Sequence, residues 1–109
     1  MTRLGKYLSQ LSEVDTAAAE QARDTLLEEL EIPSEWEVHE SDVEIAQEGP
    51  EDWFLVSFEH RSAPDHRALI FLLEGSHELQ VYLESADDTE WSDTTQNPHE
   101  ITAIIANYQ

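Results

Sequence analysis

The spacing of the apolar residues changes at Pro33, and this change restricts the fold more than any other feature of the sequence. Before Pro33 they recur every four positions, as on one face of a helix, at Ala18, Ala22, Leu26 and Leu30. After it they alternate with polar residues, as in half-buried strands, beginning with Trp36 and Val38. Proline cannot donate a backbone hydrogen bond and disfavours helical geometry in the residue before it. The chain is therefore expected to be helical first and extended afterwards.

Further patterns predict helices at both ends of the chain. Near the N-terminus, the apolar spacing predicts a short helix with one face formed by Leu4, Tyr7, Leu8 and Leu11. The helix before Pro33 should begin near Ser12 or Asp15, either of which can cap it, and run for about 16 to 19 residues. Near the C-terminus, Asn97 is a preferred capping residue and Pro98 suits the first helical position, so a last helix should begin there.

The strongest strand signal is a hairpin formed by residues 68–73 and 78–84. The first segment is apolar on both faces, which is typical of a central strand. Residues 74–77 place Gly75 at the first central position of a two-residue turn, which favours type II′ geometry. The resulting register pairs apolar residues on one face of the sheet, namely Leu72 with Leu79, Ile70 with Val81 and Ala68 with Leu83.

The parity of the strand residues predicts an irregularity ahead of this hairpin. Val43 and Ile45 alternate with acids, but at the opposite parity to Trp36 and Val38. A single straight strand would put the two pairs on different faces of the sheet. We therefore expect a bend or bulge around residues 40–42.

The other segments complete the predicted fold. Residues 53–60 are rich in aromatic and β-branched side chains and predict a strand after a turn at residues 48–51. Residues 61–65 and 86–93 are polar and are expected to be loops. We predict a single acidic α+β domain over residues 1–109. It consists of N-terminal helices, an antiparallel meander of three or four strands and a C-terminal helix, with the helices packed on one face.

The net charge of the chain is extreme for its length. It has 25 acidic and 5 basic residues, a formal charge of −20. A small domain needs a net charge of only about 2 to 8 units for solubility. Self-repulsion at this level destabilises a compact fold, so either a salty medium or a cationic partner is expected to compensate it.

Common catalytic and metal-binding patterns are absent from the sequence. There is no cysteine, no GxxxxGK or GxGxxG loop for phosphates and no GxSxG nucleophile motif. The five histidines show no metal-binding spacing, and the acids at 87–93 lack the glycine and terminal glutamate of a calcium loop. We therefore predict a protein that is not an enzyme and holds neither a metal nor a cofactor.

The sequence also carries expectations about location. No apolar stretch is long enough for a signal peptide or a membrane span. The lack of cysteine suits a reducing compartment. A cytoplasmic protein without a membrane partner is expected.

Three groups of residues are the candidate partner-binding surface. Glu20, Asp24 and Glu28 repeat every four residues on the long helix, about 6 Å apart along its axis and opposite its apolar row. Asp42 and Glu44 repeat every two residues on a strand, about 6.6 Å apart. The third group lies in the polar loop and comprises Asp87, Asp88, Glu90, Trp91 and Asp93. Acids at such spacings can present a track comparable to the phosphates of one wound DNA strand.

The tryptophans beside these acids have two interpretations. An exposed Trp91 would be an aromatic hot spot for a partner, and core packing is the alternative. For Trp53 we expect core packing.

Three functions fit these features. The first is an inhibitor that mimics nucleic-acid phosphates and blocks a basic nucleic-acid-binding protein, as anti-restriction and anti-CRISPR proteins do, without binding nucleic acid itself. The second is a cytoplasmic domain of a halophile, whose acidity is a salt adaptation. The third is an acidic chaperone or immunity protein for a cationic effector. Like charges four apart on a helix destabilise it, so a merely soluble domain has little reason to keep them. A high-salt medium or selection for a basic partner would explain them. We favour the basic partner of the first function, because Glu outnumbers Asp by 17 to 8 and arginines are few, which suits a halophile less well. The sequence leaves a homodimer open.

Overall fold

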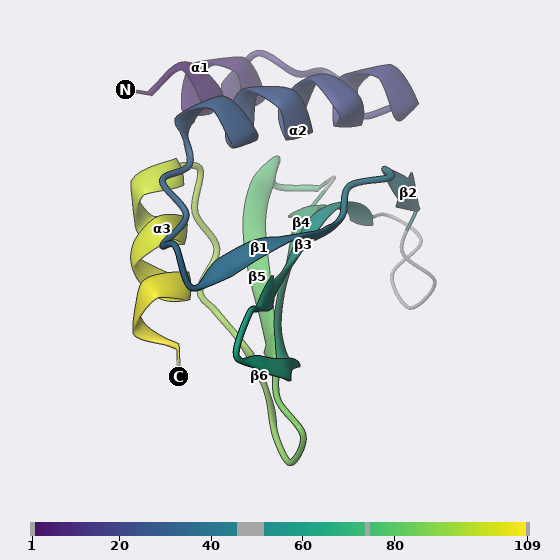
Figure 1. Cartoon of the computed structure of the whole chain (residues 1–109). Helices are drawn as coiled ribbons and strands as arrows, with labels where there is room; N and C mark the ends of the chain where they lie inside the picture. Colours follow the sequence, from purple (N-terminus) through teal and green to yellow (C-terminus); the bar gives the residue numbers. More distant parts are fainter. Residues whose placement is uncertain (1, 46–51, 74, 109) are drawn as a thin grey trace.

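The protein has an α+β fold, with three helices and a six-stranded antiparallel sheet in the residues that the computed structural model describes, 2–45, 52–73 and 75–108 (Figure 1). In chain order the elements are α1 (Arg3–Ser9), α2 (Thr16–Glu29), β1 (Trp36–Glu40), β2 (Glu44–Ile45), β3 (Asp52–His60), β4 (Ala63–Leu73), β5 (Glu78–Glu84), β6 (Thr89–Trp91) and α3 (Pro98–Asn107). This confirms the predicted class and the places of the helices. The sheet has more strands than the three or four predicted, because the short strands β2 and β6 join it.

All three helices begin at polar side chains that cap them, and Thr2, which accepts from the amide of Gly5 at 3.0 Å, caps α1. Asp15 accepts a hydrogen bond from the backbone amide of Ala18 at 2.8 Å, and α2 follows it. Asn97 accepts one from the amide of His99 at 2.9 Å, and α3 follows it. These caps satisfy amides that have no partner inside the helix. Of the two predicted caps of α2, the structure has Asp15 and not Ser12.

Helix α2 is shorter than predicted and buries a slightly different row. It has 14 residues and ends at Glu29, and beyond it the amide of Glu31 donates to the Thr102 hydroxyl of α3 at 3.2 Å. Ala19 is fully buried, whereas Ala18 of the predicted row is only half-buried. Four residues advance a helix by about 400°, so a row that repeats every four positions drifts around the helix and cannot stay buried along its length.

Tyr7 links α1 to the start of α2. Its phenol donates a hydrogen bond to the backbone oxygen of Ala18 at 3.1 Å. Burial raises the pKa of Tyr7, and the negative charge of Asp15 raises it further. The first helix is thereby held against the N-terminal turn of the second.

The predicted register of the β4–β5 hairpin is confirmed, but the predicted turn is wrong. Leu72 pairs with Leu79, and the pairing continues to Arg67 with Glu84. The strands are joined by residues 74–77, of which Glu74 lies outside the described residues. His77, and not Gly75, takes the left-handed backbone conformation with φ 56°, and its amide donates to the oxygen of Leu73 at 2.8 Å. The loop is therefore longer than a type II′ turn.

The edges of the sheet depart most from the predicted elements. A bulge at His39 shifts the register between β1 and β3, which confirms the predicted irregularity slightly ahead of residues 40–42. The predicted loop at 61–65 is shorter, because β4 already begins at Ala63. The predicted loop at 86–93 contains β6, which pairs with β5. The predicted turn at residues 48–51 lies outside the described part of the chain.

The helices and one face of the sheet enclose a hydrophobic core. In Figure 1, α1 and α2 lie across one end of the sheet and α3 runs beside it. Buried sheet residues such as Ile70 and Val81 belong to the same cluster as buried residues of all three helices. Trp53 is 7% exposed and belongs to this cluster, as predicted. The opposite face carries a chain of aromatic rings, Phe54, Phe71, Trp91 and Tyr82.

Within the described ranges, none of the helices is both long enough and apolar enough to span a membrane.

Candidate acidic binding surface

The three acids predicted on α2 are all exposed, but two of them already have cationic partners. Glu28 forms an ion pair with Arg3 of α1. Asp24 pairs with its neighbour Arg23, with 3.0 Å between Oδ1 and Nη2. Glu20 makes no ion pair within the described residues. The helix therefore carries its row of acids with part of the repulsion offset locally.

Arg23 also connects α2 to the segment between β1 and β2. Its Nη1 donates to the backbone oxygen of Ser41 at 2.8 Å, and the side chain is only 20% exposed. The same guanidinium therefore contacts both Asp24 and the strand segment that carries Asp42. The contact brings two of the three predicted groups of acids together.

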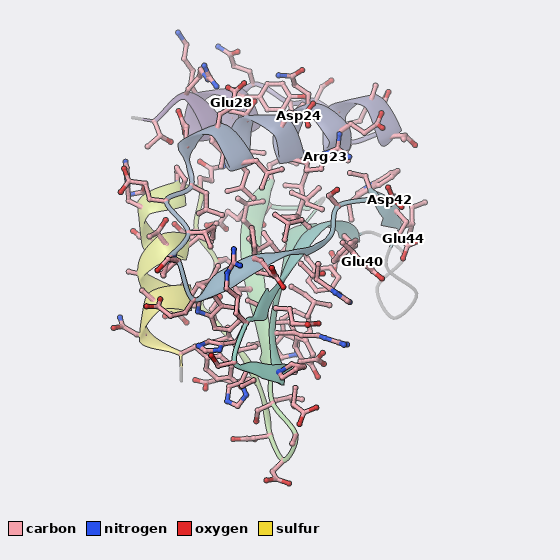
Figure 2. The ribbon with its side chains drawn as sticks, in the orientation of Figure 1. Arg23, Asp24, Glu28, Glu40, Asp42 and Glu44 are labelled. Carbon is pink, nitrogen blue, oxygen red and sulfur yellow. The ribbon has the colours of Figure 1, made fainter. Side chains whose placement is uncertain are left out.

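The acids on both sides of Ser41 in the chain are exposed, namely Glu40, Asp42 and Glu44. Figure 2 shows Glu40, Asp42 and Glu44 continuing along the side of the molecule on which Asp24 and Glu28 lie. The side chains of these three acids have no ion pair or hydrogen bond with other described residues. We call the whole set the acidic ridge, and it consists of Glu20, Asp24, Glu28, Glu40, Asp42 and Glu44.

Glu40 was not among the predicted binding residues. It is the last residue of β1 and pairs with Ser57 just after the bulge at His39. The alternation of β1 alone does not assign it a face, because the bulge changes the parity. The predicted irregularity at residues 40–42 was the only sequence signal that Glu40 could lie on a different face of the sheet from the one that the alternation of β1 gives it.

The third predicted group begins at the other end of the sheet. The loop after β5 is at the end away from α1 and α2 (Figure 1). Asp87 and Asp88 lie in this loop, Glu90 lies in β6 and Asp93 follows β6. We call these four acids the acidic tip. All four are exposed and none forms an ion pair within the described residues. The carboxylate of Asp88 accepts the amide of Thr89 at 2.9 Å, a contact inside the loop.

Trp91 lies beside the tip and is 53% exposed. Its ring contacts Tyr82 at a centroid distance of 4.6 Å and Phe71 at 5.7 Å. It also lines a hollow of about 630 Å³ between β6 and α3, where Glu90, Asp93 and Glu100 contribute. Trp91 is thus held by two rings and still presents a large surface to solvent.

The arginines of the chain are already paired with its own acids. Besides Arg3 and Arg23, Arg61 lies 3.5 Å from Glu37, and Arg67 lies 3.4 Å from Glu59. The Arg67–Glu59 contact is an ion pair without hydrogen-bond geometry, since Arg67 Nε has no hydrogen-bond partner among the described residues. The four arginines are therefore compensated internally, whereas Lys6 and most of the carboxylates form no ion pair among the described residues.

Histidine and acidic side chains are the usual protein ligands of metal ions. In the part of the chain that the structure describes, no group of three or more such side chains is placed to hold a metal ion. His39 lies 3.3 Å from Glu59, and Arg67 contacts the same carboxylate oxygen. That carboxylate is thus engaged by side chains of the sheet.

Comparison of the chain with protein-family models, with curated proteins and with solved structures finds no match.

Proposed function

We propose that the protein is an acidic inhibitor that occupies the nucleic-acid groove of a basic protein, such as a nuclease, a restriction enzyme or a CRISPR effector, in the cytoplasm. The observation that carries this proposal is the acidic ridge. It brings acids of α2 close to Glu40, Asp42 and Glu44 through Arg23, and these three acids form no ion pair with the described residues. A basic groove would supply the missing positive charge.

The spacing within the ridge supports mimicry of phosphates. Acids four apart on a helix are about 6 Å apart along its axis. Of the other ridge acids, Glu40 and Glu44 end β1 and begin β2, whereas Asp42, predicted on a strand, lies in the link between them. Winding of a DNA strand brings successive phosphates to comparable separations, and Lys and Arg bind phosphates and carboxylates by the same charge-assisted hydrogen bonds.

A competition assay with paired variants tests the proposal. The ridge variant carries Glu40→Gln, Asp42→Asn and Glu44→Gln, and the matched tip variant carries Asp87→Asn, Asp88→Asn and Glu90→Gln. Both remove three negative charges from exposed positions, so total charge is the same. We expect wild type to displace DNA from a basic DNA-binding partner, the ridge variant to lose most of this effect, and the tip variant to lose less. Equal losses would show that total charge, and not the ridge, drives binding.

The salt dependence of binding gives a second measurement. Each carboxylate that replaces a phosphate contact should make binding weaken as salt rises, because charge pairing between exposed groups is screened. The ridge variant should therefore show a shallower slope of log Kd against log salt than the tip variant. Identical slopes would contradict a contact at the ridge.

The halophile alternative makes the opposite prediction for the protein alone. A domain that depends on salt should unfold when the screening of its charges is removed. We expect circular dichroism to show a fully folded protein at about 10 mM salt, where the Debye length is about 30 Å. Unfolding at low salt and recovery at high salt would make salt adaptation the explanation of the charge. Binding to a cationic effector that DNA does not displace would instead favour the chaperone or immunity function.

A further inference from the structure

A second hollow lies where β1 begins and α3 ends, at the end of the sheet away from α2 (Figure 1). Its volume is about 540 Å³, within the usual range of small-molecule and side-chain sites. Four aromatic rings line it, from Trp36, His60, His66 and Tyr108. We call this hollow the ring cage.

The rings of the cage contact one another in a closed circuit. Trp36 meets His60 edge-on at a centroid distance of 5.2 Å, and His60 lies 6.4 Å from His66. His66 lies 5.6 Å from Tyr108, which lies 6.4 Å from Trp36. The rings come from β1, β3, β4 and the residue after α3, so the fold and not a local motif assembles them. Aromatic rings carry negative charge on their faces and attract cations placed over them.

The charges around the cage also favour a cation. Glu35 lines it, and no Lys or Arg does. The two arginines adjacent to lining residues in sequence pair with acids, Arg61 with Glu37 at 3.5 Å and Arg67 with Glu59 at 3.4 Å. A lysine or arginine in the cage would therefore have to come from outside the chain.

The end of α3 adds to this field. Ala106, in its last turn, and Tyr108, just beyond it, line the cage. The last carbonyls of a helix lack partners and carry a partial negative charge, which cations stabilise. The last turn of α3 has no basic residue to do so.

One atom of the cage indicates what kind of cation fits. His66 Nδ1 is buried and has no hydrogen-bond partner among the described residues. In the tautomer with its proton on Nε2, Nδ1 is an acceptor, so a cation with N–H groups can satisfy it. Guanidinium has a planar set of N–H donors and stacks on aromatic faces, whereas the ammonium of lysine is compact and strongly hydrated.

We propose that the ring cage receives one arginine side chain of the cationic partner. The inference rests on the proposed function, because it assumes that the partner is basic. The guanidinium lies among the four rings and is neutralised by Glu35. His66 Nδ1 is covered in the free protein, so the His66 ring turns to accept the hydrogen bond of the guanidinium. The acidic ridge and the ring cage then contact two separate parts of the partner.

A peptide titration tests the cage without the partner. The probes are acetyl-Gly-Arg-Gly-amide and its citrulline and lysine counterparts, followed by NMR of the full chain. Citrulline has nearly the shape of arginine without its charge, so it isolates the cation. We expect saturable shifts of Trp36, His66 and Tyr108 with arginine, and binding weaker by roughly tenfold or more with citrulline. Equal binding of citrulline or lysine, or shifts confined to other residues, would overturn the assignment.

Variants separate a lost contact from a lost fold. His66→Phe keeps a ring but removes Nδ1, and Glu35→Gln removes the charge of the cage. Glu31→Gln is the control. It removes an equal charge from the segment between α2 and β1 that also carries Glu35, but Glu31 does not line the cage. Both cage variants should bind the arginine peptide several-fold more weakly with an unchanged circular dichroism spectrum, whereas Glu31→Gln should bind it as wild type does. Unchanged binding by both folded cage variants would refute the proposal.

The two proposals can fail separately. If the protein binds the arginine peptide but the ridge variant still competes with DNA as wild type does, the proposal for the ring cage is supported and the proposal for the acidic ridge is refuted. If the ridge variant loses competition but the protein does not bind the arginine peptide, the acidic ridge is supported and the ring cage is refuted.

Discussion

The acidic ridge and the acidic tip are both rows of exposed carboxylates, but the fold holds them differently. On the ridge, Arg3 and Arg23 pair with acids of α2, and Arg23 also reaches Ser41 in another element. At the tip, the carboxylate of Asp88 contacts only the adjacent amide of Thr89. Charged groups therefore join two elements at the ridge, whereas at the tip they project from a loop and the short strand that follows it.

This difference shows where a chain with few cations needs them. Repulsion between acids on a helix cannot be relieved by a change of backbone, because the helix fixes their spacing. A loop can spread its charges and leave them solvated. The ridge and the tip therefore differ in the placement of arginines and not in the number of acids. The arginines lie at the ridge, where the helix fixes the spacing of the charges.

The largest effect on this comparison should come from Arg23→Met. The substitution keeps much of the side-chain volume but removes the charged hydrogen bond to Ser41 and the pair with Asp24. We expect the free energy of unfolding to fall by about 2 kcal/mol, the usual value for a hydrogen bond with a charged partner. Urea denaturation measures it.

Arg61→Met is the matched control. It removes the same charge from an exposed ion pair with Glu37, and such pairs contribute about 0 to 1 kcal/mol. An equal loss in the two variants would show that net charge, and not the link from α2 to the strands, determines stability.

A smaller effect is expected from Asp15→Ala. Loss of the cap of α2 should lower the free energy of unfolding by about 1 kcal/mol, whereas Asp88→Ala at the tip should change it by less than about 0.5 kcal/mol. Thermal or urea denaturation compares them. Equal effects would contradict a stabilising role of Asp15 as the cap of α2.

The same substitution should also change the titration of Tyr7. Folding raises the pKa of its phenol, so the folded state favours the neutral form. Its contribution to stability is therefore complete below the ordinary phenol pKa of about 10 and is lost as pH rises through the raised value. Asp15→Ala removes one of the two causes and should lower the pKa of Tyr7, as ultraviolet titration would show. A pKa that does not fall would contradict the contribution of Asp15.

The smallest effect should be a gain. Glu20→Gln removes repulsion with Asp24 and should stabilise the protein by about 0.2 to 0.5 kcal/mol at low salt. The gain should vanish near 1 M salt, where the Debye length is about 3 Å. Asp87→Asn at the tip should give no comparable gain. A gain from Glu20→Gln that persists at 1 M salt would indicate a cause other than charge.

The features predictable from the sequence are those set by local spacing. Alternation across residues 68–84 is enough to pair Leu72 with Leu79. The left-handed residue of the turn, however, is His77 and not Gly75. Asn97 and Pro98 define the start of α3 for the same local reason. The exposed strand β6 has no apolar alternation on its surface, so it could not be distinguished from a loop.

The candidate sites were less predictable, because they depend on contacts between distant residues. The helical period places Glu20, Asp24 and Glu28 on one side, but only the reach of Arg23 to Ser41 joins them to the strands. The ring cage combines positions 36, 60, 66 and 108, which share no sequence pattern. Such sites follow from the packing of elements, which the order of residues does not show directly.

The free edges of the sheet give the acids one more consequence. β1 is an outer strand, and Val38 in it is 52% exposed between Glu37 and Glu40. An open strand edge is a template on which another chain can add, and charges along it discourage that addition. A second copy approaching β1 would bring its own carboxylates against the first. The negative charge that favours a basic partner therefore also disfavours aggregation through β1. Protonation of the carboxylates by acid, or screening by concentrated salt, would weaken both partner binding and this repulsion.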